Sequence, residues 1–188
     1  MDSASNVGLY SSLIFDAGDV ALIAYQDSTN LDLKVARAQQ GTWSLSTVDS
    51  TGSTGYWPSI SRSAQGRVAI AYNDNTSYYR LRYAELSSGT WSTQTALSVS
   101  STHVSAYPLM TWLDEIPMLS SFRYQDNSIQ ATYFASSTWV TTRISNAGTA
   151  YSDYRTVSAT ANICGEPVLA YSRVDPYVGN YYLALQTF

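Results

Sequence analysis

The sequence predicts an all-β fold of four repeated units, and three observations support this class. A Thr-Trp pair recurs at a constant interval of 48 positions, and its tryptophans are Trp43, Trp91 and Trp139. A short apolar run that ends in an aromatic residue recurs four times, and the aromatic residues are Tyr25, Tyr72, Phe122 and Tyr171. β-Branched and aromatic residues are separated by Gly, Ser, Asn and Asp at intervals too short for helices. Repeats of about 40–50 residues built from short strands are typical of β-propeller blades, whose small sheets need neighbours to cover both faces.

Each unit is expected to contain four strands, which we call a, b, c and d. In the second unit we place them at Trp57–Arg62, Arg67–Asn73, Tyr79–Glu85 and Thr90–Leu97. The b strands of the other units are predicted at Val20–Tyr25, Met118–Phe122 and Pro167–Tyr171. Strand b is mostly apolar, as expected for a strand that neighbouring sheets cover on both faces. Strand c alternates polar and apolar residues, which is expected nearer the rim of a propeller.

The turns between strands a and b carry residues that suit tight hairpins. Gly18 and Gly66 fall in these turns in the first two units, where we expect glycine to supply a positive φ. The third unit has no glycine there, and Pro117 is expected at the first residue of its strand b, a position that tolerates proline.

The four units are expected to form one domain, with bounds near 4–51, 52–100, 101–149 and 150–188. Strand c of the fourth unit is predicted at Tyr181–Leu185, and this last blade lacks its outer strand d. Three arrangements stay open: a closed four-bladed ring, an eight-bladed ring made by two copies, and a part of a longer propeller. We favour the last two, because open blade edges present unpaired backbone groups and promote self-association.

Composition excludes several classes of partner. The chain has 188 residues, of which 45% are hydrophobic and 13% charged, as in ordered globular proteins. Its net charge of −4 and its ten Lys and Arg residues do not supply the basic field that nucleic-acid binding requires. No apolar stretch approaches the ~20 residues of a membrane span. The surface is expected to be polar through Ser, Thr, Asn and Tyr more than through charged residues. This favours a secreted or cell-surface protein, whose signal peptide is not present in this sequence.

The sequence offers little catalytic or metal-binding chemistry. His103 is the only histidine, and no Gly-x-Ser-x-Gly motif accompanies it, so a Ser-His-Asp triad is not indicated. Cys164 is the only cysteine and is expected to be a small buried residue. One histidine and one cysteine do not make a zinc site. We therefore predict no cofactor, although oxygen-rich loops could hold calcium.

Polar loops after strand b recur in all four units and form the candidate site. Each has an Asp shortly after the strand-b aromatic, and an aromatic series at positions 10, 57, 107 and 154 keeps step with them. One interpretation is structural, since Asp and Asn form Asx turns in hairpins. The other is a ring of carboxylates, amides and aromatic faces that binds sugars. The candidate ligand-binding residues are Asp27, Asn30, Trp57, Asp74, Asn75, Tyr78, Tyr107, Asp126, Asn127, Tyr154, Asp175 and Tyr177.

The repeated phrase is an apolar run ending Ala-Tyr-x-Asp, then Leu-x-Tyr-Ala and Gly-Thr-Trp. It resembles repeats of bacterial extracellular β-propeller proteins of the sialidase-like and lectin-like kind. The resemblance implies the fold but no particular activity. Sialidases carry Ser-x-Asp-x-Gly-x-x-Trp boxes, of which Gly41 with Trp43 and Gly89 with Trp91 keep only the Gly and Trp.

These observations favour a non-catalytic module that binds glycans or a surface protein through the face formed by the b–c and d–a loops. A fragment of a glycan-processing, sialidase-like enzyme is the first alternative. A set of structural, self-assembling blades is the second.

Overall fold

The computed structural model describes residues 2–3, 6–76, 79–98, 105–126, 128–146, 157–161, 167–174 and 181–187, the last three ranges mainly by their backbone. Every regular element in these ranges is a strand, which confirms the all-β class. The described chain accordingly contains no long apolar helix that could cross a membrane. The strands are β1 (Val7–Phe15), β2 (Ala21–Asp27), β3 (Asp32–Gln39), β4 (Thr42–Asp49), β5 (Tyr56–Arg62), β6 (Val68–Asp74), β7 (Arg80–Ser87), β8 (Thr90–Leu97), β9 (Ser105–Leu113), β10 (Ile116–Arg123), β11 (Ser128–Ala135), β12 (Thr138–Asn146), β13 (Val157–Ala161), β14 (Pro167–Val174) and β15 (Tyr181–Thr187).

The described strands form four antiparallel sheets, each in chain order. We call β1–β4 the first sheet, β5–β8 the second, β9–β12 the third and the three strands β13–β15 the fourth. In the second sheet the four predicted strands match β5–β8 to within two residues at either end. The repeat read from the tryptophan interval is therefore one sheet long.

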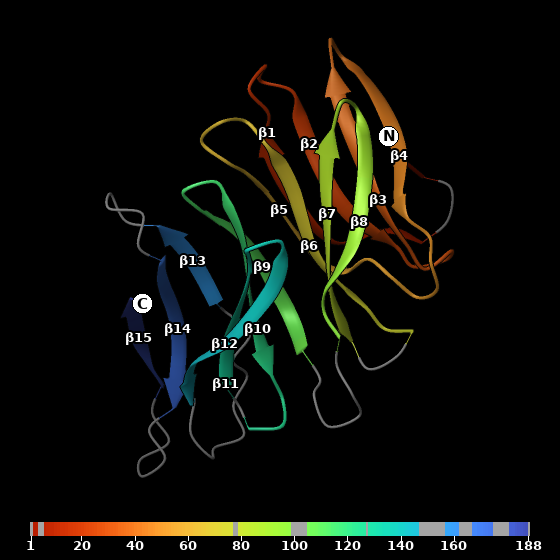
Figure 1. Cartoon of the computed structure of the whole chain (residues 1–188). Helices are drawn as coiled ribbons and strands as arrows, with labels where there is room; N and C mark the ends of the chain where they lie inside the picture. The colour runs from red at the N-terminus through yellow and green to blue at the C-terminus, as the bar shows by residue number, and fades with distance from the viewer. Residues whose placement is uncertain are drawn as a thin grey trace.

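The four sheets stand side by side in a row, with the first and the fourth at opposite ends (Figure 1). The first strand of each sheet contacts the first strand of the next, so that β1, β5, β9 and β13 follow one another along one edge of the row. Later strands of each sheet lie progressively farther from this edge. The edge formed by the first strands therefore brings together residues from different repeats.

The turns between the third and fourth strand of each complete sheet have the same conformation. Both residues of each two-residue turn have a positive φ, as a type I′ hairpin requires. These pairs are Gln40 and Gly41 (φ 52° and 77°), Ser88 and Gly89 (50° and 79°), and Ser136 and Ser137 (49° and 70°).

The turns between the first and second strands differ from the sequence-based prediction in two details. Gly66 has the predicted positive φ of 88°, but Gly18 does not, and the neighbouring Asp19 adopts 54° instead. Gly18 donates its backbone N–H to the Asp16 carboxylate at 2.8 Å, so an aspartate cap replaces the expected glycine conformation. In the third sheet β10 begins at Ile116, so Pro117 is the second residue of the strand and not the first.

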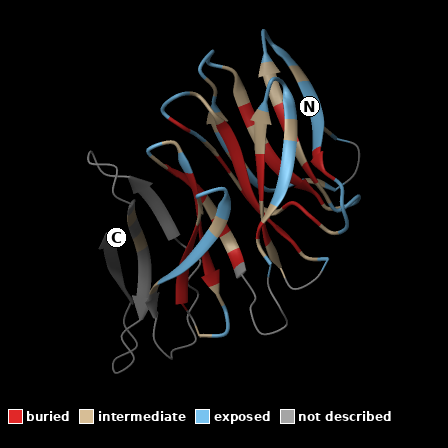
Figure 2. Ribbon diagram, in the orientation of Figure 1, coloured by how far each residue is buried: buried red, intermediate tan, exposed pale blue. Residues whose placement is uncertain are grey.

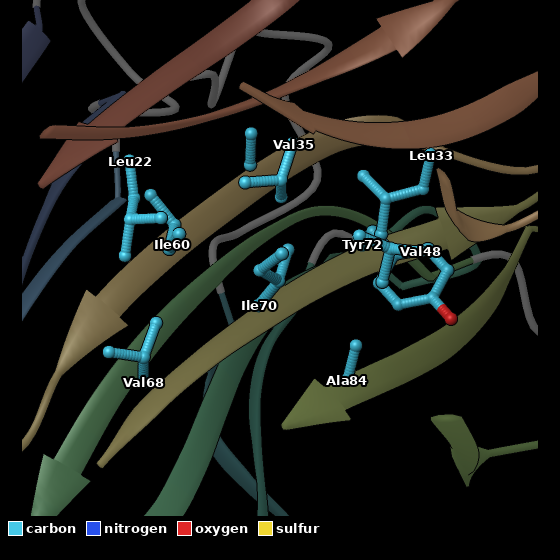
Figure 3. Packing of buried hydrophobic residues seen from close by; sticks show 10 residues of the cluster. Leu22, Leu33, Val35, Val48, Ile60, Val68, Ile70, Tyr72 and Ala84 are labelled. Carbon is cyan, nitrogen blue, oxygen red and sulfur yellow. The ribbon is translucent and has the colours of Figure 1, made fainter. Parts of the chain in front are cut away.

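The hydrophobic core fills the space between neighbouring sheets. Every residue of β6 is buried, because this strand lies between the first and third sheets (Figure 2). The core between the first two sheets takes apolar side chains from both of them (Figure 3). They are Leu22, Ala24, Leu33, Val35 and Val48 from the first sheet and Ile60, Val68, Ile70, Tyr72 and Ala84 from the second. This agrees with the expectation that strand b would be covered on both faces.

The recurring tryptophan anchors a sheet on the one before it. Trp91, in the outermost strand of the second sheet, packs against the core shared with the first sheet. Trp139 repeats this in the third sheet, where its ring centroid lies 5.1 Å from that of Tyr83 and its Nε1 donates to Gln94 Oε1 at 3.0 Å. The 48-residue interval thus marks a contact between sheets.

Serine hydroxyls also connect neighbouring first strands. The Ser12 hydroxyl accepts a hydrogen bond from the backbone N–H of Ile60 at 3.2 Å. One repeat later, the Ser59 hydroxyl accepts from the N–H of Met110 at 3.0 Å. The next position in this series is Leu109, whose side chain has no hydroxyl to accept such a bond.

Candidate ligand-binding site

An irregularity in the first strand of each complete sheet turns one aromatic residue out of the regular pleat. Tyr10, Trp57 and Tyr107 have φ values of 55°, 48° and 52°. Each lies where the pairing register of its strand shifts, as in a β-bulge. A positive φ in a bulky residue costs about 1–3 kcal/mol and persists only where the surrounding structure imposes it. Bulges of this kind are over-represented beside functional sites, where they redirect a side chain.

The three redirected residues meet at the edge formed by the first strands. Trp57 is at the centre, with its ring centroid 5.6 Å from that of Tyr10 and 4.5 Å from that of Tyr107. Tyr79 adds a further ring 5.3 Å from Trp57, and Tyr56 lies 5.9 Å from it. We call this group, together with Tyr124, the aromatic cluster.

Tyr124 extends the aromatic cluster across the third sheet. Its hydroxyl donates to the Tyr107 hydroxyl at 3.3 Å, and the two ring centroids are 6.5 Å apart. The cluster therefore draws its six rings from three sheets. Tyr10 and Tyr124, at its two ends, are 44% and 46% exposed, while Trp57 between them is half-buried. The two end rings are therefore open to a ligand from solvent.

The aromatic cluster combines flat apolar faces with neutral hydroxyls. Burial is the main reason that the pKa of Tyr79 lies above its ordinary value of 10.0. The neighbouring phenols of Tyr56, Tyr10 and Tyr107 raise this pKa further. Tyr79 therefore stays protonated at neutral pH and can both donate and accept hydrogen bonds. Such an arrangement suits an uncharged ligand that has apolar faces and many hydroxyl groups.

The predicted aspartates of the first two b–c loops are turned into the protein. Asp27 is 1% exposed and accepts hydrogen bonds from the backbone N–H groups of Thr29 and Asn30, each at 3.1 Å. Asn30 Nδ2 also donates to Asp27 Oδ2 at 2.8 Å, and this side-chain bond is the main reason that the pKa of Asp27 falls below its usual range. Asp27 and Asn30 thus form the Asx turn that was one of the two interpretations.

Asp74 repeats this behaviour in the second sheet. It is fully buried, caps the turn by accepting from the N–H of Thr76 at 2.8 Å, and pairs with Arg80 at 2.6 Å. Asn75 uses its backbone N–H to bind the Ser53 carbonyl at 2.7 Å, which joins this loop to the segment that connects β4 to β5.

Asp126 lies in a different setting in the third sheet. It accepts from the Ser128 hydroxyl at 2.6 Å and forms ion pairs with Arg123, at 3.2 Å, and Arg143. Burial would raise the pKa of Asp126, but the Ser128 hydrogen bond and the two guanidinium charges outweigh it and leave the pKa below its usual range. All three described aspartates of the candidate set therefore have partners within their own sheets.

The structure thus brings together only part of the predicted set. Trp57 and Tyr107 are in contact, whereas Asp27, Asp74 and Asp126 serve their own loops. Sequence reasoning missed Tyr124, although a signal existed: it stands two positions after the strand-b aromatic, where the first two units have Asp27 and Asp74. Several predicted residues lie outside the described residues, namely Tyr78, Asn127, Tyr154, Asp175 and Tyr177, as do His103 and Cys164.

Within the described ranges, no three His, Cys, Asp or Glu side chains gather closely enough to hold a metal ion.

Comparison with known proteins gives a fold but no family. No protein-family model matches the sequence, and no curated protein matches it. Among solved structures, one from Dyadobacter fermentans described as a protein of unknown function has a TM-score of 0.65 at 10% identity, covering 95% of this chain and 59% of that one. An α-L-arabinofuranosidase from Lactobacillus brevis has a TM-score of 0.60 at 10% identity, with 95% and 67% covered. The intramolecular trans-sialidase from Ruminococcus gnavus has a TM-score of 0.56 at 12% identity, with 94% and 42% covered.

The chain spans about 59% of the first of these structures and less than half of the trans-sialidase. At 10–12% identity the likeness concerns the fold alone. Glycoside hydrolases and sialidases of this shape are β-propellers, and the described sheets share their architecture. The chain therefore has a β-propeller-type fold of the kind found in glycoside hydrolases and sialidases.

Proposed function

We propose that this protein is a non-catalytic, glycan-binding β-propeller module of a secreted or cell-surface protein. Each sheet is one blade, with unit bounds near 4–51, 52–100, 101–149 and 150–188, and the last blade lacks its outer strand. The ligand binds on the face of the b–c and d–a loops, against the aromatic cluster. The observation that carries this proposal is the meeting of three residues with positive φ, Tyr10, Trp57 and Tyr107, around one exposed aromatic surface.

The chemistry of the cluster favours a sugar. Pyranose rings present C–H groups on their faces and hydroxyls at their edges, which complement the ring of Trp57 and the phenols around it. The carboxylates of the neighbouring loops are engaged by turns and by Arg side chains, which favours binding over hydrolysis. The solved structures of similar shape include proteins named for action on glycans, which is consistent with a carbohydrate-related role.

A glycan microarray followed by titration calorimetry tests this proposal. Trp57→Ala should weaken binding of the best glycan by at least about tenfold, which corresponds to about 1.4 kcal/mol. Tyr10→Ala, at an exposed ring, should weaken it less. Val140→Ala, at an apolar residue of the outer strand β12 that is 37% exposed, is the control and should bind as the unmodified protein does.

Three outcomes would contradict the proposal. Binding that survives both aromatic substitutions would place the ligand elsewhere. Cleavage of a bound glycan, seen by mass spectrometry after incubation, would favour the glycan-processing alternative. Absence of any glycan binding would leave a surface protein as the better ligand class, since Tyr and Trp are also enriched where proteins meet.

A further inference from the structure

One face of the first sheet has no preceding sheet of the described chain packed against it. The equivalent faces of the second and third sheets are buried against the sheet before them. In the second sheet, the face turned toward the first consists of Ile60, Val68, Ile70, Tyr72, Ala84, Leu86 and Trp91. The repeat interval assigns the same positions in the first sheet to Leu13, Ala21, Ile23, Tyr25, Ala36, Ala38 and Trp43. We call this set the leading face.

The leading face of the first sheet is partly open to solvent. Ile60 is 5% exposed and Ile70 fully buried, whereas Leu13, at the position of Ile60, is 54% exposed. A cavity of about 310 Å³ opens between Ile23, Tyr25, Ala36 and Trp43. In the second and third sheets the equivalent tryptophan packs against the preceding sheet. Trp43 therefore borders an apolar space of the kind that Trp91 and Trp139 help to close.

The fourth sheet, at the other end of the row, offers the complementary half of the same contact. Val168 and Ala170 of this sheet are half-buried. Their equivalents in the first sheet, Leu22 and Ala24, are 2% and 0% exposed because the second sheet covers them. The strand register pairs Tyr171 with Ala184, as Tyr25 is paired with Lys34. This register puts Leu183 and Leu185 at the positions of Leu33 and Val35 in that contact. The trailing positions of the fourth sheet are thus apolar in sequence.

We propose that a second copy of this chain covers the leading face with its fourth sheet. The two apolar halves lie at opposite ends of one row (Figure 1), so they meet between molecules in the way that consecutive sheets meet within one. Two copies joined head to tail at both ends form a closed ring of eight blades, which lies inside the range of known propellers. Closure matters because a head-to-tail contact that does not close grows into a filament.

The contact within the chain predicts the contact between the copies. Leu22 lies beside Ile60 in the core between the first two sheets (Figure 3). The corresponding pair in the proposed ring is Leu13 with Val168 of the partner subunit. A charge at either position removes an apolar contact from both junctions of the ring at once. The proposal is independent of glycan binding, because neither residue belongs to the aromatic cluster.

Light scattering coupled to size exclusion, from micromolar to hundred-micromolar protein, tests the ring. The unmodified chain should show twice the monomer mass of 20.6 kDa throughout. Leu13→Glu and Val168→Arg should each shift the mass to that of the monomer. Ile116→Glu, at an apolar residue of the third sheet that is 43% exposed, is the matched control and should remain dimeric.

A monomer mass for the unmodified chain would overturn the proposal. Dissociation by Leu13→Glu but not by a folded Val168→Arg would exclude the head-to-tail arrangement, and masses that rise without limit would indicate a filament. Circular dichroism reports whether each variant keeps its strands. Val168→Ser is the milder variant should Val168→Arg fail to fold, and it should weaken the dimer without destroying it.

Discussion

The buried hydroxyl of Tyr72 provides a sharp test of how neighbouring sheets are held together. Tyr72 is fully buried between the first and second sheets, and its hydroxyl donates to Asp49 Oδ2 at 2.6 Å. Arg82 Nη2 binds the same carboxylate oxygen at 3.1 Å and also reaches Asp74 at 3.5 Å. A residue at the end of the first repeat is thereby fixed to two strands of the second. Tyr72→Phe removes one hydrogen bond from this group without changing its shape.

The expected loss follows from the charge of the acceptor. Hydrogen bonds to a charged group contribute about 1.5–3 kcal/mol to stability. Asp49 keeps Arg82 as a partner in the variant, so its charge is not left unpaired. For a chain of this length, about 1.5–3 kcal/mol corresponds to a decrease of about 3–12 °C in Tm. Tyr25→Phe removes the equivalent bond to Asp2, of 2.7 Å, but the loss should be smaller, because this site is more open to solvent.

Thermal unfolding followed by circular dichroism measures the effect, with urea unfolding to give the free energy. Tyr10→Phe, at a ring that is 44% exposed, is the matched control and should change stability by less than about 0.5 kcal/mol. Equal losses for Tyr72→Phe and Tyr10→Phe would show that the buried hydroxyl contributes nothing net, and the reasoning would be wrong.

Three further predictions concern other features of the fold. Ser59→Ala leaves the backbone N–H of Met110 without its acceptor and should lower the free energy of unfolding, measured in urea, by about 1–3 kcal/mol. Ser137→Gly should raise it by about 1 kcal/mol, because this residue has a φ of 70° and the equivalent turns have glycine; an unchanged value would contradict the assignment of strain. Burial, with the nearby carboxylates, raises the pKa of Tyr72 and Tyr25 above 10.0, so their contribution is complete below about pH 10 and is lost as the pH rises further. Unfolding midpoints measured across this alkaline range should fall, and should fall less in Tyr72→Phe.

The repeat and its strands could be predicted because one physical requirement recurs in every unit. A small sheet must bury both faces, so strand b is apolar throughout and a tryptophan returns at the same place. The turn at Gly66 was predicted for a similar local reason, since glycine adopts its positive φ of 88° without strain. These features depend on residue type and local spacing, which a sequence displays directly.

The candidate site was less predictable because the aromatic cluster depends on contacts between repeats. Nothing in the sequence near Trp57 shows that its backbone has a positive φ, or that Tyr10 and Tyr107 approach it from other sheets. Asp27 and Asp74 recur with equal regularity, but their side chains cap their own turns. Regular recurrence therefore does not distinguish residues that cap turns from residues of the aromatic cluster, whereas their contacts in the structure do.

The third unit shows where framework and site diverge. Phe122 replaces the tyrosine that binds a carboxylate in the first two units, and Ile129, which pairs with it across the strands, replaces the basic residue. The whole polar group is thus exchanged for an apolar pair, which avoids an unpaired charge. The position equivalent to Asp74 in this unit is Tyr124. Its ring joins the aromatic cluster through Tyr107. Because Ile129 stands where Arg82 pairs with Asp74, an aspartate at position 124 would lack this cationic partner, and the tyrosine there instead adds a ring to the aromatic cluster.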